Sequence, residues 1–69
     1  MTNWTFKKTP KNNILIFQKE ESQPEIFVGE AAGLHIALTE VASFFKPEDI
    51  VTTPEGKCIV AKTTGELNN

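Results

Sequence analysis

The chain contains one histidine, His35, and one cysteine, Cys58, as candidates for acid–base or nucleophilic chemistry. A catalytic histidine needs a nucleophile or an orienting acid within reach, and Glu40 lies about 140° away around the predicted helix. A reactive cysteine needs nearby positive charge and solvent access. Cys58 instead precedes apolar Ile59 and Val60, and we expect it to be buried as a small hydrophobic side chain. The residues therefore predict a surface histidine, a buried thiol and no enzymatic activity.

Metal and cofactor binding find no support in the residue pattern. One cysteine and one histidine cannot supply the four ligands of a structural zinc site. The acidic residues Glu20, Glu21 and Glu25 cluster, but calcium loops need several ligands at fixed spacing and a turn glycine. Because this segment has neither, we expect a solvated acidic loop and no cofactor.

Aromatic and lysine residues in the first part of the chain indicate one possible binding function. Single-strand nucleic-acid binders stack bases on aromatic side chains of a sheet and contact phosphates with lysines. The residues that fit this pattern are Trp4, Phe6, Lys7, Lys8 and Lys11. Against it, the formal net charge is −2 and all 7 basic residues are lysine, so the planar fork of arginine is absent. A small core also needs both aromatic rings.

These side chains must be positioned by one helix and a sheet. Residues 30–46 have a helical apolar period at 100° per residue. One arc of this helix holds Leu34, Ala37, Leu38, Val41, Ala42 and Phe45, with Phe44 at its edge. The opposite arc holds His35, Thr39, Glu40 and Ser43. Either Gly29 or Gly33 begins the helix. Pro47 ends it, or opens a short helical turn over residues 47–49.

Five segments have the pattern of strands: residues 3–9, 14–20, 25–28, 50–53 and 57–63. Alternation in the first strand places Trp4 and Phe6 on its core side. The turns at residues 10–13 and 54–56 contain a proline followed by an asparagine or glycine that tolerates left-handed backbone. The two segments on either side of each turn therefore read as hairpins.

Register decides which side chains share a face, because a slip of one residue exchanges the faces. We favour pairing of Phe17 with Phe27. One face of residues 14–28 then holds Ile14, Ile16, Ile26 and Val28, with Ile16 opposite Val28. The other face holds Leu15, Phe17 and Phe27. The alternative register, with Phe17 opposite Val28, mixes the two sets. In the last hairpin, Val51 pairs with Ile59 and Ile50 with Val60.

Together these elements predict an α+β fold in one small domain spanning residues 1–69. We expect an antiparallel β-sheet made of a three-strand meander, one amphipathic helix and a C-terminal hairpin, in the order β-β-β-α-β-β. Residues 64–69 are expected to form a frayed tail. No segment has the roughly 18 apolar residues of a membrane span or the apolar core of a signal peptide. A cytoplasmic chain without membrane contact is therefore expected.

A surplus of apolar surface carries the functional prediction. One helix can cover one sheet face, which leaves Leu15, Phe17 and Phe27 on the other, with Val51 and Ile59 beside them in one register. Contiguous apolar patches usually mark interfaces, and a chain this small gains stability from a partner. We therefore predict a non-enzymatic protein-binding or regulatory module, such as a small inhibitor or accessory factor. It would act as a homodimer and bind a further, unidentified protein. The alternative is single-stranded nucleic-acid binding.

Overall fold

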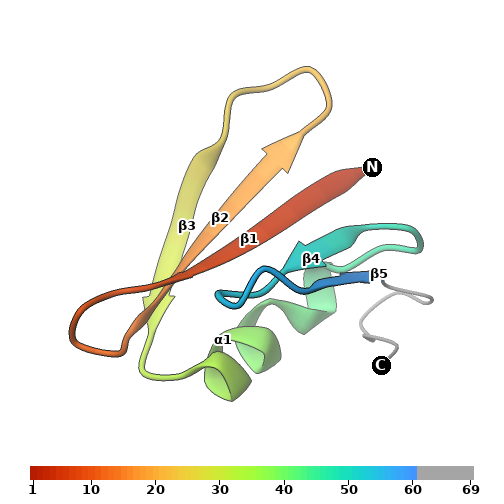
Figure 1. Ribbon diagram of the computed structural model, residues 1–69. Helices are drawn as coiled ribbons and strands as arrows, with labels where there is room; N and C mark the ends of the chain where they lie inside the picture. Colours follow the sequence, from red (N-terminus) through yellow and green to blue (C-terminus); the bar gives the residue numbers. More distant parts are fainter. Residues whose placement is uncertain (61–69) are drawn as a thin grey trace.

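The first strand along the chain is the central strand of a five-stranded sheet. The computed structural model describes residues 1–60. Its elements are β1 (Thr2–Lys8), β2 (Ile14–Glu20), β3 (Ile26–Ala31), α1 (Leu34–Val41), the 3-10 turn η1 (Ala42–Phe44), β4 (Ile50–Thr52) and β5 (Cys58–Val60). The order across the sheet is β3-β2-β1-β4-β5 (Figure 1). The predicted frayed tail, 64–69, and the end of the last predicted strand, 61–63, lie outside the described residues.

The α+β class is confirmed, but the prediction of a purely antiparallel sheet is wrong. β1 pairs with β2, and β2 with β3, in antiparallel fashion. β4 lies on the other side of β1 and runs parallel to it, with Trp4 opposite Val51. The connection through α1 carries the chain past β2 and β1 (Figure 1). The expected meander and separate hairpin are therefore parts of one mixed sheet.

One buried carboxylate joins the start of β1 to the segment before β4. Asp49 is 2% exposed. Its Oδ1 accepts a hydrogen bond from the Thr2 backbone N–H at 3.0 Å, and its Oδ2 accepts from Trp4 Nε1 at 3.4 Å and the Lys46 N–H at 2.9 Å. A buried carboxylate needs such donors to replace lost hydration. The parallel pairing of β1 with β4 is thus fixed by side-chain as well as backbone bonds.

The core lies between one face of the sheet and α1. Trp4 and Phe6 of β1 are 2% and 1% exposed, which confirms that they face the core. The buried cluster consists of Trp4, Phe6, Ile14, Ile16, Ala31, Ala37, Val41, Phe45 and Val51. Trp4 and Phe45 meet edge to face, with ring centroids 5.5 Å apart, a favoured aromatic geometry. Leu34, Leu38 and Ala42 pack against this cluster, as the helical period predicts.

The helix is shorter than the predicted span of residues 30–46. It begins after Gly33, one of the two predicted starts, and its last regular residue is Val41. Residues 30 and 31 belong instead to β3, where Ala31 pairs with Ile14 and is buried. Glu30 and Ala31 favour helix over strand by intrinsic propensity, so pairing with β2 overrides their local preference.

The β1–β2 and β4–β5 turns share one sequence pattern, Thr-Pro-x-(Asn or Gly)-x. In each, the threonine Oγ1 accepts a hydrogen bond of 3.1 Å from the backbone N–H four residues later. The left-handed position holds Asn12, with φ 68°, or Gly56, with φ 87°. This confirms the predicted turns, because proline fixes the first corner and the fourth residue tolerates positive φ.

The turn before β4 differs from the short helical turn predicted over residues 47–49. The Asp49 N–H donates to the Lys46 carbonyl at 3.0 Å, which closes a four-residue turn around Pro47 and Glu48. Glu48 has a φ of 75°, in the left-handed region that glycine or asparagine normally occupies at the third position of a type II turn. The backbone is therefore strained at Glu48.

The Asp49 site generates the first prediction. Asp49→Ala leaves three N–H donors in the protein interior without their acceptor, and each unsatisfied buried donor costs about 1–3 kcal/mol. We expect a loss of about 3 kcal/mol in the free energy of unfolding, measured by urea denaturation. Asp49→Asn keeps an acceptor oxygen and should lose less, and Glu55→Ala at an exposed turn should lose almost nothing. Equal stability of the two Asp49 variants would contradict the role assigned to these bonds.

The strained turn generates the second prediction. Glu48→Gly relieves a left-handed conformation that costs about 1–2 kcal/mol for a residue with a side chain, although glycine adds entropy to the unfolded chain. Glu55→Gly, at a turn position without positive φ, gives only the entropic loss. We expect the free energy of unfolding of Glu48→Gly, measured by urea denaturation, to exceed that of Glu55→Gly by about 1–2 kcal/mol. The reverse order would show that Glu48 is unstrained.

Candidate functional site

The sheet face opposite α1 carries the surface of interest, here called the open face. Pairing places its side chains: Thr5 lies opposite Phe17 and Thr52, and Phe17 lies opposite Phe27. Continued over all strands, the open face consists of Asn3, Thr5, Lys7, Leu15, Phe17, Lys19, Phe27, Glu30, Ile50, Thr52, Cys58 and Val60. The buried helix residues contact only the other face. Within residues 1–60, therefore, no helix covers the open face.

Two phenyl rings and a lysine lie next to one another on the open face. The ring centroids of Phe17 and Phe27 lie 5.7 Å apart in an edge-to-face arrangement, and Phe27 is 58% exposed. The Lys7 Nζ lies 4.9 Å from the Phe17 centroid, within the range of a cation–π interaction. Neighbouring strands thus hold an aromatic pair, exposed at Phe27 and half-buried at Phe17, with a positive charge beside it.

The predicted pairing of Phe17 with Phe27 is confirmed, but the pairing of Ile16 with Val28 is wrong. A bulge shifts the register between these positions, so that Ile16 lies opposite Gly29. Ile14 and Ile16 are buried as expected, whereas Ile26 and Val28 remain exposed. Bulges concentrate at sheet edges, and β3 is an edge strand. Ile26 lies opposite Gln18, itself opposite Trp4, so its exposed side chain is on the helix side of this edge and not on the open face.

The structure brings together the three residues predicted for an interface. Leu15, Phe17 and Phe27 all project from the open face, with Leu15 and Phe17 partly exposed. The predicted pairs of the last hairpin, Val51 with Ile59 and Ile50 with Val60, are confirmed. Val51, however, is buried against the helix, so Ile50 and Val60 are the pair on the open face. The parallel pairing of Trp4 with Val51 decides this, and local sequence carries no signal for it.

The residues considered for nucleic-acid binding are divided between different surfaces. Trp4 and Phe6 are core residues, so neither ring is available to stack on a base. Lys7 is on the open face, whereas Lys8 lies opposite buried Ile14 at the end of β1. Lys11 is exposed in the turn between β1 and β2. The aromatic rings that are accessible near a lysine are instead those of Phe17 and Phe27.

The two candidates for reactive chemistry are both exposed. His35 lies on the outer side of α1, as predicted, and its carbonyl accepts a hydrogen bond from Thr39 Oγ1 at 2.8 Å. The expectation of a buried Cys58 is wrong, because β5 is an edge strand and Cys58 projects from the open face. Its sulfur lies 3.8 Å from Thr52 Oγ1. Among residues 1–60, neither side chain has a hydrogen-bonded acidic or basic partner of the kind that catalysis requires.

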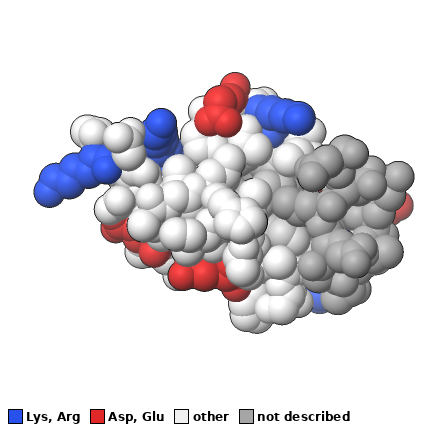
Figure 2. All heavy atoms as spheres, turned by 90° about the horizontal axis from the view of Figure 1, so that it is seen from below, with Lys and Arg blue, Asp and Glu red and all other residues white. Residues whose placement is uncertain are grey.

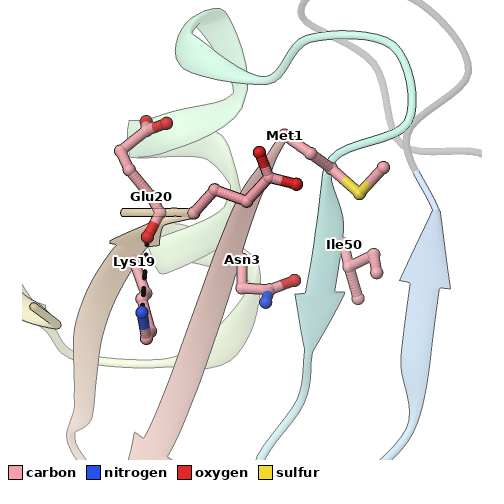
Figure 3. A pocket seen from close by; sticks show the side chains of 6 residues that line it. Met1, Asn3, Lys19, Glu20 and Ile50 are labelled. Atoms are coloured by element: carbon pink, nitrogen blue, oxygen red, sulfur yellow. Dashed lines mark hydrogen bonds between the residues drawn. The ribbon is translucent and has the colours of Figure 1, made fainter. Parts of the chain in front are cut away.

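A hollow of about 230 Å³ lies at one end of the open face. Lys19, Asn3 and Ile50, on three neighbouring strands, form its floor, and Met1 and Glu20 lie at its end (Figure 3). The Lys19 ammonium donates to the carbonyls of Glu20 and Gln23. Glu20 accepts from Thr2 and Gln18. Glu21 completes the lining, so the hollow is bordered by both an ammonium and carboxylate groups.

Charged side chains surround uncharged surface at the end of the molecule that carries α1. Seen from this end, lysines and acids lie at the margin and the centre is white (Figure 2). The helix side also exposes Ile36 and Phe44, the latter at 63%. Phe44 was expected at the edge of the buried arc and lies outside the core. It therefore serves as an exposed aromatic ring remote from the open face.

No protein-family model matches this chain, and neither a curated protein nor a solved structure was found to be similar to it. In the part described, residues 1–60, no three His, Cys, Asp or Glu side chains are grouped so as to hold a metal ion. The same residues contain no helix with the length and apolar character needed to cross a bilayer. The candidate site is therefore the open face, defined by its own geometry.

Proposed function

We propose that the protein is a non-enzymatic protein-binding module that associates with a second copy of itself through the open face. The observation that carries this proposal is the Phe17–Phe27 pair, with Phe27 exposed and Phe17 half-buried, on a sheet face that no helix covers within residues 1–60. Exposed contiguous apolar surface usually marks an interaction site. Aromatic residues are also enriched among the side chains that dominate binding energy.

The size of the open face determines how strong this association can be. β1 and β2 have 7 residues each, β3 has 6, and β4 and β5 have 3 each. With strands about 4.8 Å apart and a rise of about 3.3 Å per residue, the face covers about 400 Å². Standard interfaces bury about 800 Å² per partner, and smaller ones belong to weak, transient complexes. We therefore propose a reversible homodimer that exchanges readily for another protein partner.

Such exchange suits a regulatory role as a small inhibitor or accessory factor. A face shared between self-association and a second partner makes partner binding depend on protein concentration. The single thiol, Cys58, is exposed, and a protein without disulfides is suited to a reducing compartment. We accordingly propose a cytoplasmic location.

The homodimer proposal predicts that Phe27→Ser weakens self-association. The change removes an exposed ring from the edge strand β3 of the open face, while the core is untouched. Sedimentation equilibrium at concentrations up to several hundred micromolar should show wild type dimerising and the variant as monomer. Phe44→Ser is the matched control, because that ring is similarly exposed but lies on η1. It should dimerise like wild type.

Cys58 offers a second readout of the same surface. Because it lies on the open face, dimerisation should slow its reaction with a thiol reagent as protein concentration rises, and Phe27→Ser should abolish that protection. A wild-type protein that stays monomeric at several hundred micromolar, with unprotected Cys58, would contradict the homodimer.

Single-stranded nucleic-acid binding is the second candidate, and one observation favours it. Phe17 and Phe27 present accessible rings on an antiparallel part of the sheet, with Lys7 4.9 Å from one of them. Bases stack on such platforms while lysines contact phosphates. The net charge of −2 and the burial of Trp4 and Phe6 oppose it, so we rank it below protein binding.

Salt dependence separates the two functions. Phosphate contacts release counterions, so nucleic-acid affinity falls steeply as salt rises. We expect fluorescence anisotropy of a labelled single-stranded oligonucleotide to remain unchanged on adding the protein at low salt. A salt-sensitive rise that Phe17→Ser and Lys7→Ala remove, and Lys8→Ala leaves in place, would reverse the ranking.

A further inference from the structure

The sheet ends at β3, and the outer edge of this strand is unpaired within residues 1–60. β3 is last in the strand order and pairs with β2, and Figure 1 shows no strand beyond it. Among the described turns and loops, no backbone hydrogen bond reaches residues 26–31. This strand of 6 residues therefore presents free N–H and carbonyl groups, which are a template for a further strand.

The edge has little of the protection that exposed strands usually carry. Proteins block such edges with lysine, proline, bulges or a covering segment, and residues 26–31 contain neither lysine nor proline. A bulge is present, but residues on both sides of it remain paired with β2. Three consecutive apolar residues, Ile26, Phe27 and Val28, are 53%, 58% and 42% exposed. The edge is therefore open to another extended chain.

We infer that the β3 edge binds an extended segment of another protein, in which aliphatic and lysine side chains alternate. The segment adds to the sheet as a further strand beside β3. In such complexes backbone hydrogen bonds supply affinity, and the side chains on the two faces supply specificity. The inference rests on the proposed protein-binding function, but it concerns the rim of the sheet and does not require the homodimer.

On the helix side, the edge suits an aliphatic side chain. The exposed Ile26 side chain lies on this side, because Ile26 is opposite Gln18, which is opposite Trp4. A hollow of about 170 Å³ adjoins it, lined by Gln18, Glu20, Gln23, Pro24 and Ile26. Since a cavity of about 150 Å³ holds a benzene ring, one aliphatic side chain of an added strand fits here.

On the open-face side, the edge suits a lysine. Phe27 and Glu30 lie opposite Phe17 and Leu15, so they are neighbours on this face. A lysine beside them contacts a phenyl ring and a carboxylate together, and Lys7 already lies 4.9 Å from Phe17 in this way. Glu30 accepts a 2.7 Å hydrogen bond from Asn13 at Oε2. Its Oε1 is the atom that we assign to the incoming ammonium.

Charge separates a basic segment from a second copy of β3. Residues 20–34 contain four glutamates and no lysine or arginine: Glu20, Glu21, Glu25 and Glu30. Lys7 and Lys19 belong to β1 and β2, inward of the edge, and the Lys19 ammonium donates to the carbonyls of Glu20 and Gln23. Two β3 strands side by side would bring like charges together, which destabilises strand pairing. A lysine-bearing strand carries the opposite charge.

A short labelled peptide that alternates valine and lysine is the probe. Fluorescence anisotropy at low micromolar protein should show binding, whereas a peptide that alternates valine and glutamate should not bind. Two N-methylated forms, one methylated on its valines and one on its lysines, test the backbone pairing. Because neighbouring residues of a strand direct their N–H groups to opposite edges, one form should lose binding and the other should keep it.

Two substitutions test the side-chain contacts. Glu30→Gln keeps an oxygen for Asn13 but removes the charge, and it should weaken binding of the valine–lysine peptide about threefold. Ile26→Ser removes apolar wall and should weaken binding about tenfold. The matched controls are Glu55→Gln, at an exposed turn position, and Ile36→Ser, at a residue of α1 that is 47% exposed. Both should bind like wild type.

Hydrogen exchange of individual amides locates the complex. We expect the peptide to slow exchange in residues 26–31 and to leave β5 unchanged. Equal binding of the two N-methylated forms, or equal binding of the valine–glutamate peptide, would overturn the inference. Protection of β3 that grows with protein concentration in the absence of peptide would assign the edge to a second copy instead.

The same experiments keep this inference distinct from the homodimer. A protein that dimerises through the open face but binds no peptide rejects the edge site and retains the homodimer. A protein that stays monomeric and binds the peptide does the reverse. Circular dichroism of each variant confirms that the fold is retained.

Discussion

The fold depends on one buried carboxylate, that of Asp49. It receives hydrogen bonds from the Thr2 and Lys46 backbones and from the Trp4 indole, and so connects the first strand to the end of the crossover. A lone buried charge would be unfavourable, but charge-assisted hydrogen bonds are about twice as strong as neutral ones. The carboxylate therefore stabilises the one arrangement that brings all three donors together. That arrangement is the parallel pairing of β1 with β4, from which the mixed sheet and its two faces follow.

Sequence patterns predicted those parts of the fold that are determined locally. The buried positions of Trp4 and Phe6 follow from alternation, and the two hairpin turns follow from proline with Asn12 or Gly56. The apolar arc of the helix also follows from its period. Each of these features depends on residues within one or two turns of chain, where backbone preferences and side-chain period act together.

Features that depend on distant pairing could not be predicted in this way. Trp4 and Val51 are far apart along the chain, and no local pattern distinguishes a parallel from an antiparallel neighbour for β1. The extension of β3 to Ala31 depends on Ile14 of another strand, and the bulge near Val28 depends on how the edge is paired. The candidate site was therefore predicted at Leu15, Phe17 and Phe27, on what the structure shows to be β2 and β3. Ile50 and Val60 could be added only after β4 had been placed.

The position of β1 in the middle of the sheet has a consequence for how the chain folds. β1 and β2 form a hairpin of neighbouring residues, which can form early because the intervening loop is short. The other edge of β1 must wait for β4 and for Asp49, which is 47 residues away from its partner Thr2. Contacts of long sequence separation slow folding. Closure of that single long loop is therefore the step that we expect to set the folding rate.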